Sequence, residues 1–216
     1  MKSLILTIAF ALAVFSLAYS QEYTIVFLNK NPDAGEMSKA EVDKIMEGHS
    51  AIRERLAKEG KLLAAGPFEG GGGIYIMKTT STEEARQWIA EDPGIKSGRW
   101  NVEILPYKPR QGGVCPVGEN YTMTNYTFVR FDAIVTKTTA HNFADIIRQH
   151  DDYLKQIGQS GNVITEAVFG ERDGGILIMK GEVPHELFDA DPAVQQGLIQ
   201  FGIKNFYTAK GAFCEQ

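Results

Sequence analysis

Cysteine and basic charge are both scarce in this sequence, and each shortage excludes a class of protein. The 216 residues include 2 Cys, too few for a disulfide-rich scaffold or for a zinc site built from cysteines. The 22 Lys and Arg are outnumbered by 27 Asp and Glu, which gives a formal net charge of −5. A chain with this balance has no overall positive field to hold nucleic acid or an anionic membrane. We therefore expect neither as a partner.

Motifs for cofactors and covalent catalysis are also missing. The sequence has no dinucleotide-binding glycine fingerprint, no GxSxG elbow and no CxxC pair, so nothing indicates a redox cofactor or a covalent nucleophile. His141 and His185 show no convergent ligand spacing with the other histidines, and we expect no metal site. The Gly-rich run EGGGG (69–73) joins two predicted strands and precedes no helix. We interpret it as a flexible hairpin rather than a phosphate-binding loop.

The first twenty residues have the pattern of a signal peptide. Lys2 precedes an apolar run from Leu4 to Ala18, and Ala18 and Ser20 fit a small-x-small cleavage site. The alternative is a membrane anchor, which needs about 20 apolar residues, more than this run supplies. No later segment is apolar enough to span a bilayer. We predict cleavage after residue 20, a mature chain beginning at Gln21, and a periplasmic or secreted protein.

Export to an oxidising compartment changes how the two cysteines are interpreted. Cys115 lies in a Gly/Pro-rich stretch and Cys214 is third from the C-terminal end, so both are expected in loops. In such a compartment a structural disulfide between them is favoured over two free thiols.

The chain contains the same pattern twice. In each half a histidine is followed by a glycine eleven residues later, then by a strand-like segment ending in IMK, then by an Asp-Pro pair. We predict a first repeat at 21–110, a linker at 111–124 and a second repeat at 125–216. The matching features are His49, Gly60, GIYIMK (73–78) and Asp92-Pro93 in the first half, and His150, Gly161, GILIMK (175–180) and Asp191-Pro192 in the second.

Each half has the element order β-α-β-β-α-β. Ser38 with Glu41 and Ser81 with Glu84 have the spacing of capping boxes, and they predict one helix reaching Lys58 and another ending at Asp92-Pro93. The second helix of the second half, around HELFDA, is expected to be very short. This order is typical of a ferredoxin-like α+β unit. Two such units would pack through their open sheet faces into an internal pseudo-dimer, an intramolecular α+β barrel, so we expect a monomer.

His49 and His150 both fall on the apolar stripe of a predicted helix, facing the sheet. The candidate partners are Asp92 and Asp191, which would orient the imidazoles for acid–base work. The alternative is that the histidines belong to the core and that each Asp before Pro only forms a turn. The sequence separation cannot decide whether they touch.

The pattern resembles the YCII-related (YciI-like) proteins of the dimeric α+β barrel superfamily. The residues that carry the resemblance are His49, AAGPF (64–68) and Asp92-Pro93, with His150 and Asp191-Pro192 in the second copy. Members are typically small domains that pair through their sheets, with a His–Asp couple proposed as catalytic, and relatives include dehalogenases of chlorinated aromatics. The resemblance implies two couples, His49 with Asp92 and His150 with Asp191.

The resemblance also places Gly66 and Pro67 at the edge of a substrate pocket. The second copy departs from the pattern, since TEAVF (165–169) replaces AAGPF and introduces Glu166. Any activity is therefore expected in the first copy. Arg53, Arg55 and Arg148 are interpreted as a solvated helix face rather than as an anion clamp.

Three functional hypotheses follow. The first is an exported enzyme that uses His49 as acid or base and Asp92 as its orienting group, for proton transfer, elimination or isomerisation on a small organic molecule. The second is a non-catalytic periplasmic module that binds a small ligand and has structural histidines. The third is an envelope-associated interaction protein whose cleft is filled by side chains.

Overall fold

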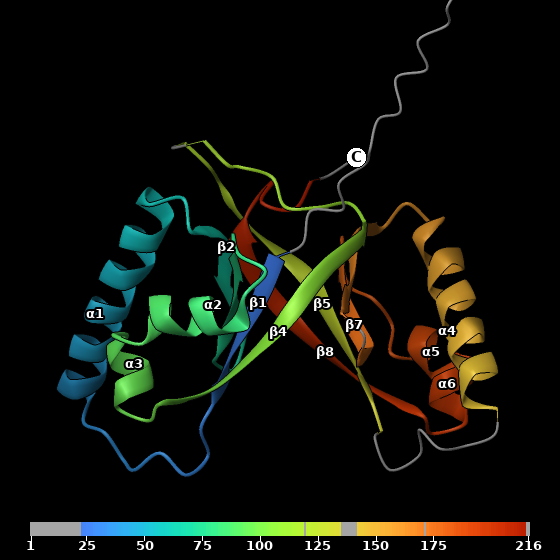
Figure 1. Cartoon of the computed structure of the whole chain (residues 1–216), viewed down its shortest axis with the longest axis horizontal. Helices are drawn as coiled ribbons and strands as arrows, with labels where there is room; N and C mark the ends of the chain where they lie inside the picture. Colours follow the sequence, from blue (N-terminus) through green and yellow to red (C-terminus); the bar gives the residue numbers. More distant parts are fainter. Residues whose placement is uncertain (1–22, 119, 135–141, 171, 215–216) are drawn as a thin grey trace, which may run out of the picture.

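A computed structural model describes residues 23–118, 120–134, 142–170 and 172–214. These residues form eight strands in one antiparallel sheet, with helices on its outside (Figure 1). The α+β class predicted from the sequence is confirmed. The predicted signal peptide, residues 1–20, lies outside the described residues. No helix within the described ranges is long and apolar enough to cross a membrane.

The first half of the chain begins its long helix where the sequence predicts it. The Ser38 hydroxyl accepts a hydrogen bond from the Glu41 N–H, and the Glu41 carboxylate accepts one from the Ser38 N–H, which completes the capping box. The second expected box is only half formed, because the Glu84 carboxylate binds the Thr79 hydroxyl instead. The elements are β1 (Tyr23–Lys30), α1 (Lys39–Lys58), β2 (Leu62–Pro67), β3 (Gly73–Met77), α2 (Thr82–Ile89), α3 (Pro93–Lys96) and β4 (Trp100–Gln111).

The second half has the same order of strands and helices. Its second helix is as short as HELFDA suggests, since α5 has four residues. In both halves a separate short helix, α3 or α6, follows the Asp-Pro pair, which the sequence did not predict. The elements are β5 (Met123–Ala133), α4 (Phe143–Gly158), β6 (Val163–Phe169), β7 (Arg172–Met179), α5 (Glu186–Asp189), α6 (Pro192–Gln195) and β8 (Ile199–Ala209).

The eight strands lie in the order β2-β3-β1-β4-β6-β7-β5-β8. The two halves are joined where β4 pairs with β6, with Lys108 opposite Val168. The outermost strands, β2 and β8, also meet: the Glu69 N–H donates to the Asn205 carbonyl at 3.0 Å, and the Thr208 hydroxyl donates to the Ala65 carbonyl at 2.8 Å. The halves are therefore connected along two seams, and the sheet closes on itself.

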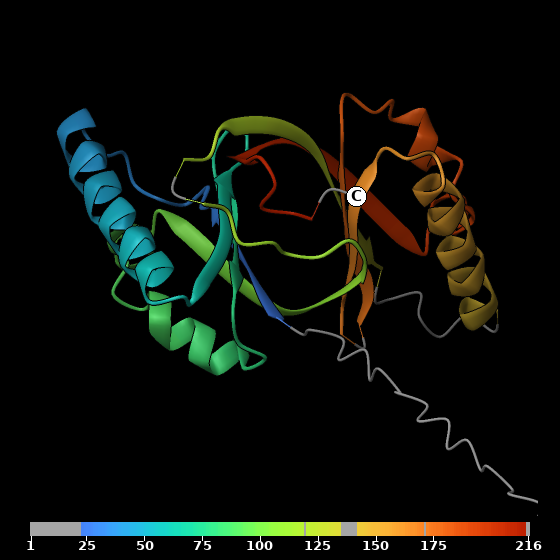
Figure 2. The same cartoon turned by 90° about the horizontal axis from the view of Figure 1, so that it is seen from above.

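Three apolar cores fill the space on both faces of this sheet. A central core lies between the two halves, with Phe27 of β1 and Phe128 of β5 in edge-to-face contact at 6.2 Å. The two others lie between the sheet and the helices, around Leu56 of α1 and Leu154 of α4. The view from above shows the helices on opposite sides with the strands between them (Figure 2). Burial on both faces explains why β1 and β3 are almost continuously apolar.

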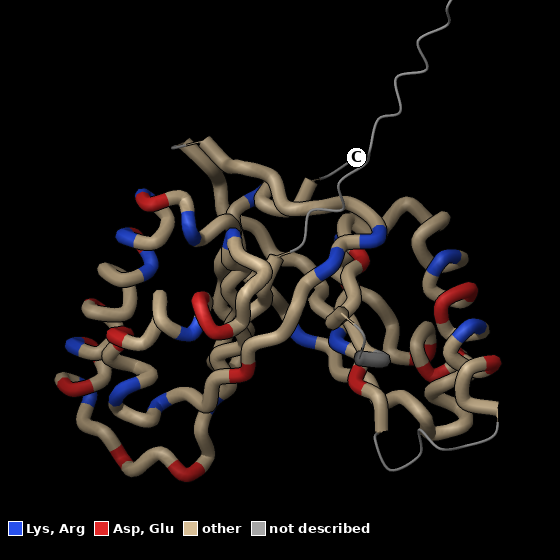
Figure 3. Tube along the Cα trace, in the orientation of Figure 1, with Lys and Arg blue, Asp and Glu red and all other residues tan. Residues whose placement is uncertain are grey.

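Charge is spread over the outer surface. Acidic and basic residues are interspersed along both long helices, α1 and α4 (Figure 3). Several form pairs within one helix, such as Arg55 with Glu59 at 2.9 Å and Lys155 with Asp152 at 3.0 Å. Such exposed pairs contribute little to stability, and they agree with the solvated helix face predicted for Arg55.

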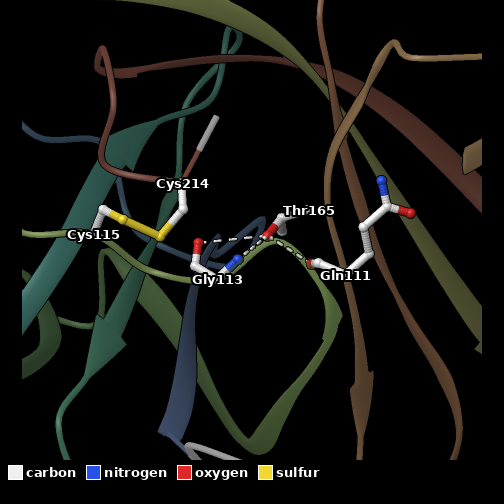
Figure 4. Close-up of a disulfide and its surroundings, with 5 residues drawn as sticks. All are labelled: Gln111, Gly113, Cys115, Thr165 and Cys214. Atoms are coloured by element: carbon white, nitrogen blue, oxygen red, sulfur yellow. Dashed lines mark hydrogen bonds between the residues drawn. A yellow bond between two sulfur atoms is a disulfide. The ribbon is translucent and has the colours of Figure 1, made fainter. Parts of the chain in front are cut away.

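The predicted disulfide is present and joins Cys115 to Cys214 across 99 residues (Figure 4). It links the segment after β4 to the segment after β8, which also pair through backbone hydrogen bonds such as Cys115 N–H to the Ala212 carbonyl at 2.9 Å. Beside it, the Thr165 hydroxyl of β6 accepts from the Gly113 N–H at 3.1 Å and donates to the Gln111 carbonyl at 3.2 Å. The bond therefore fastens the C-terminal end of the second half to the linker.

Removing this disulfide should destabilise the protein without changing its fold. The Cys115→Ser/Cys214→Ser variant is expected to lose about 4 kcal/mol of unfolding free energy, because a loop of this length is no longer closed in the unfolded chain. Chemical denaturation of the oxidised wild type, the reduced wild type and the variant measures this. Equal midpoints for all three, or free thiols in the oxidised wild type by intact mass, would contradict the prediction.

Candidate active site

Close packing of two helices brings the first predicted pair together. Gly48 of α1 lies against Pro93 at the start of α3, and a Cβ on Gly48 would stand 2.6 Å from the Pro93 Cγ. A larger residue would push α1 away from α3. Because His49 is the next residue, this approach places its imidazole beside Asp92, 43 residues further along the chain. Packing thus supplies a contact that sequence spacing cannot predict.

The Asp92 carboxylate has two hydrogen-bond partners and no solvent exposure. Its Oδ2 lies 2.7 Å from His49 Nδ1, and its Oδ1 accepts from the Gly94 N–H at 2.8 Å as the N-cap of α3. Asp92 therefore both forms the turn at the start of α3 and contacts the imidazole of His49, the two roles between which the sequence could not decide. A carboxylate held in this way fixes the proton of the histidine on Nδ1 and leaves Nε2 as its basic atom.

A tyrosine completes this cluster. The Tyr75 hydroxyl of β3 lies 3.1 Å from His49 Nε2, and the two rings are stacked, with centroids 5.9 Å apart. Burial raises the pKa of Tyr75 above its ordinary value, the nearby Asp92 charge raises it further, and Arg53 lowers it. The phenol therefore remains protonated and can donate a hydrogen bond. The sequence pattern did not single out this residue, although GIYIMK and GILIMK differ at that one position.

His49 faces a cavity of about 220 Å³. The imidazole lies against the indole of Trp100, with ring centroids 4.5 Å apart. The EGGGG segment forms the predicted hairpin between β2 and β3, and its glycines also line this cavity, which was not predicted. The residues of this first-half cavity are Leu28, Met46, His49, Ser50, Arg53, Ala65, Gly66, Pro67, Gly71, Gly72, Gly73, Ile74, Tyr75, Arg99 and Trp100.

Gly66 and Pro67 lie on the wall of this cavity, where the resemblance places them. Gly66 has a second role at the seam between β2 and β8: a Cβ there would stand 2.3 Å from the Tyr207 carbonyl oxygen and 2.6 Å from the Phe206 ring. The absence of a side chain lets the two strands meet. Contact of Gly66 or Pro67 with a substrate remains a prediction.

Arg53 was interpreted as part of a solvated helix face, and this was wrong. It is half-buried and lines the cavity together with Arg99. Arg55 and Arg148 do lie on exposed helix surface, where they pair with Glu59 and Asp145. The helical spacing alone could not separate Arg53 from Arg55, because the wall opposite Arg53 comes from β2, β3 and their hairpin.

The second predicted pair has the same backbone geometry. His150 Nδ1 lies 2.6 Å from Asp191 Oδ2, and Asp191 Oδ1 accepts from the Ala193 N–H at 2.8 Å as the N-cap of α6. Around it the chemistry differs. Leu177 stands opposite Glu166 in the strand pairing, where Tyr75 stands opposite Ala65 in the first half. Leu177 has no hydroxyl, so this position offers His150 no counterpart of the Tyr75 hydroxyl that lies beside His49.

A buried carboxylate lies near His150 instead. Glu166 is 7% exposed and lines a cavity of about 80 Å³ with His150, Arg110 and Asp151. Arg110 lies 2.6 Å from Asp151 and 3.5 Å from Glu166. Burial raises the pKa of the Glu166 carboxyl, while the Arg110 charge acts in the opposite direction. The third carboxylate noted in the sequence thus faces this smaller cavity rather than solvent.

No metal-binding cluster of three or more His, Cys, Asp or Glu side chains is present among the described residues. His185 lies on the surface, 2.9 Å from Asp189. His141 lies outside the described residues.

Residues 23–108 match the family model of the YCII-related domain. The match covers the first half, including His49, Asp92, Tyr75 and the wall of the first-half cavity.

Two solved structures are similar in overall arrangement. A candidate chlorite dismutase is 9% identical, with 87% of this chain and 94% of that chain covered and a TM-score of 0.49. A candidate monooxygenase from Fusobacterium nucleatum subsp. nucleatum is 10% identical, with 92% and 99% covered and a TM-score of 0.42. Comparison with curated proteins finds no match.

Neutralising Glu166 should change how stability depends on pH. A carboxyl whose pKa is raised by folding stabilises the protein most below its ordinary pKa, and that contribution is lost as the pH rises through the raised value. The unfolding free energy of Glu166→Gln should therefore fall less than that of the wild type between about pH 4 and pH 7. Urea denaturation at both pH values measures the difference. The same loss in both proteins would show that the Glu166 pKa is not raised.

Proposed function

We propose that the protein is an exported enzyme that transfers a proton to or from a small organic molecule in the first-half cavity, with His49 as the acid or base. The observation that carries the proposal is the His49–Asp92 contact at the wall of a cavity large enough for a small ligand. Asp92 is the positioning residue, since it binds Nδ1 and leaves Nε2, which lies 3.1 Å from the Tyr75 hydroxyl, as the atom that takes or gives a proton.

Tyr75 contributes a hydrogen-bond donor at the same place. A phenol that stays protonated beside His49 Nε2 can stabilise negative charge that develops on a substrate oxygen when a neighbouring proton is removed. His49, Asp92 and Tyr75 together support proton abstraction, and with it isomerisation or elimination. The proposal needs no cofactor.

The second half is proposed to be a second copy of the same unit that has kept its structure and lost the activity. The shared element order, the two Asp N-caps and the two matching His–Asp distances support a common origin. The smaller cavity and the replacement of Tyr75 by Leu177 support the loss of function. We also propose that the mature chain begins at Gln21 and acts in the periplasm or outside the cell, where its disulfide persists.

Proton transfer can be tested by hydrogen exchange. Small carbonyl compounds and organic acids with an activated C–H are incubated with the protein in D2O, and loss of the C–H signal is followed by NMR. At least one compound should exchange with the wild type, and His49→Gln should reduce the rate by about 100-fold or more. The matched control, His150→Gln, should retain the rate. Exchange that persists in His49→Gln, or is abolished only in His150→Gln, would overturn the proposal.

The mature protein is expected to be a monomer. Each half already covers the inner sheet face of the other through the central core, so within the described residues the inner sheet faces are not open to a second chain. Sedimentation velocity over a wide concentration range should give one species with the mass of one chain. A stable dimer would mean that a surface other than the inner sheet faces drives association.

A further inference from the structure

We propose that the first-half cavity selects a small organic anion and that Arg53 and Arg99 bind its charged group. This inference rests on the proposed function, because the anion would be the substrate of the His49 site. It adds the chemical class of that substrate and names two specificity residues.

The two arginines lack the carboxylate partners that Arg55, Arg110, Arg130 and Arg148 have, and unlike the exposed Arg86 they are partly withdrawn from water. Arg55 pairs with Glu59, Arg110 with Asp151, and Arg130 with both Glu103 and Asp132. Among the described residues, no salt bridge is found for Arg53 or Arg99. A guanidinium that is partly withdrawn from water without a counter-ion is poised to bind one.

Arg99 has a more specific feature that points to a bound ligand. Its Nε atom is buried and has no hydrogen-bond partner within the described part of the chain. Buried donors are rarely left unpaired in proteins. Since Arg99 lines the cavity beside the Trp100 ring, a bound acceptor is the group that would satisfy it. Arg53 lies on the opposite element, α1, close enough to Tyr75 for its charge to lower the pKa of the phenol.

Among the residues that the structure describes, the walls of the first-half cavity contain no acidic side chain to neutralise these charges. The lining of the first-half cavity includes no Asp or Glu, and the nearby Asp92 is already engaged by His49 and by the Gly94 N–H. A neighbouring outer groove of about 560 Å³ shares Gly71, Gly72, Arg99 and Trp100 with the cavity and adds Lys30, again without an acidic residue. The local field therefore favours an anion, although the whole chain is acidic.

The second half provides an internal comparison. Four residues after the histidine the first half has Arg53 and the second has Leu154. Between the glycine after the short helix and the start of the last strand, the first half has Arg99 and the second has Leu198. Both leucines are buried. Arginine at these two positions is therefore confined to the half that has the larger cavity and Tyr75, and the shared fold does not require it. Arg110, which lines the second-half cavity, is paired with Asp151.

Benzoate and its neutral analogue benzamide test the charge preference. The readout is the indole N–H resonance of Trp100 in a ¹⁵N NMR titration, with Trp88 as the internal reference because it lies on α2 outside the cavity. Benzoate should shift Trp100 and leave Trp88 unchanged, and it should bind at least about tenfold more tightly than benzamide. Acetate, as a second carboxylate, should compete with it.

Leucine variants test the two arginines, since the second half accommodates leucine at both positions. Arg53→Leu and Arg99→Leu should each weaken benzoate binding by about tenfold or more, with little change for benzamide. Arg55→Leu, which removes the same charge from the exposed face of α1, should bind benzoate like the wild type. Equal affinity for benzoate and benzamide, no shift of Trp100 at millimolar benzoate, or equal binding by Arg99→Leu and Arg55→Leu would each overturn the inference.

The outcome separates this inference from the proposed function. If benzoate binds as expected but hydrogen exchange does not depend on His49, the cavity is an anion-binding site and the enzymatic proposal is wrong. If exchange depends on His49 but neutral and anionic compounds bind alike, the enzymatic proposal stands and the anion preference is wrong.

Discussion

The need to bury both faces of the sheet is the constraint on which this structure depends. The strands of each half have apolar residues on both faces. One face is covered by helices, and the other must be covered by the strands of a second unit. Within the described chain these covering strands come from the other half. The two sets of strands are joined where β4 meets β6 and where β2 meets β8. The helices are thereby forced to the outside, and each histidine lies on the buried face of a long helix rather than in the central core.

Within that frame a buried carboxylate organises the site. An ionisable group without solvent exposure must have its oxygens bonded, and Asp92 meets this requirement with a backbone N–H of α3 and the imidazole of His49. The contact that stabilises a short helix therefore also sets the orientation of the histidine. The same arrangement at Asp191 shows that this is a property of the fold. What differs between the halves is the set of side chains around each His–Asp pair, and we propose that these side chains determine the function.

Local features of the sequence predicted local structure well. The Ser38–Glu41 box and the apolar strands depend on neighbouring residues, so each could be recognised directly, whereas the short helices that begin at the Asp-Pro pairs were not predicted. The pairing of His49 with Asp92 depends on long-range packing, and only the repeat and the family resemblance suggested it. Tyr75 was hidden because it lies in a strand buried throughout, where a tyrosine is typical of the core. Arg53 was assigned to the solvated helix face and Arg99 was not singled out, because a cavity wall is assembled from several elements and the charge pattern of one helix does not reveal it.

The measurement that tests the central claim most directly is the ¹⁵N chemical shift of the two ring nitrogens of His49 at a pH where the ring is neutral. The structure predicts that the proton resides on Nδ1 in the wild type, because Asp92 accepts it there. In Asp92→Asn this preference should weaken and the Nε2–H tautomer should become populated. A wild-type ring protonated on Nε2, or a tautomer that is the same in both proteins, would contradict the account, since Asp92 would then not position His49 for proton transfer.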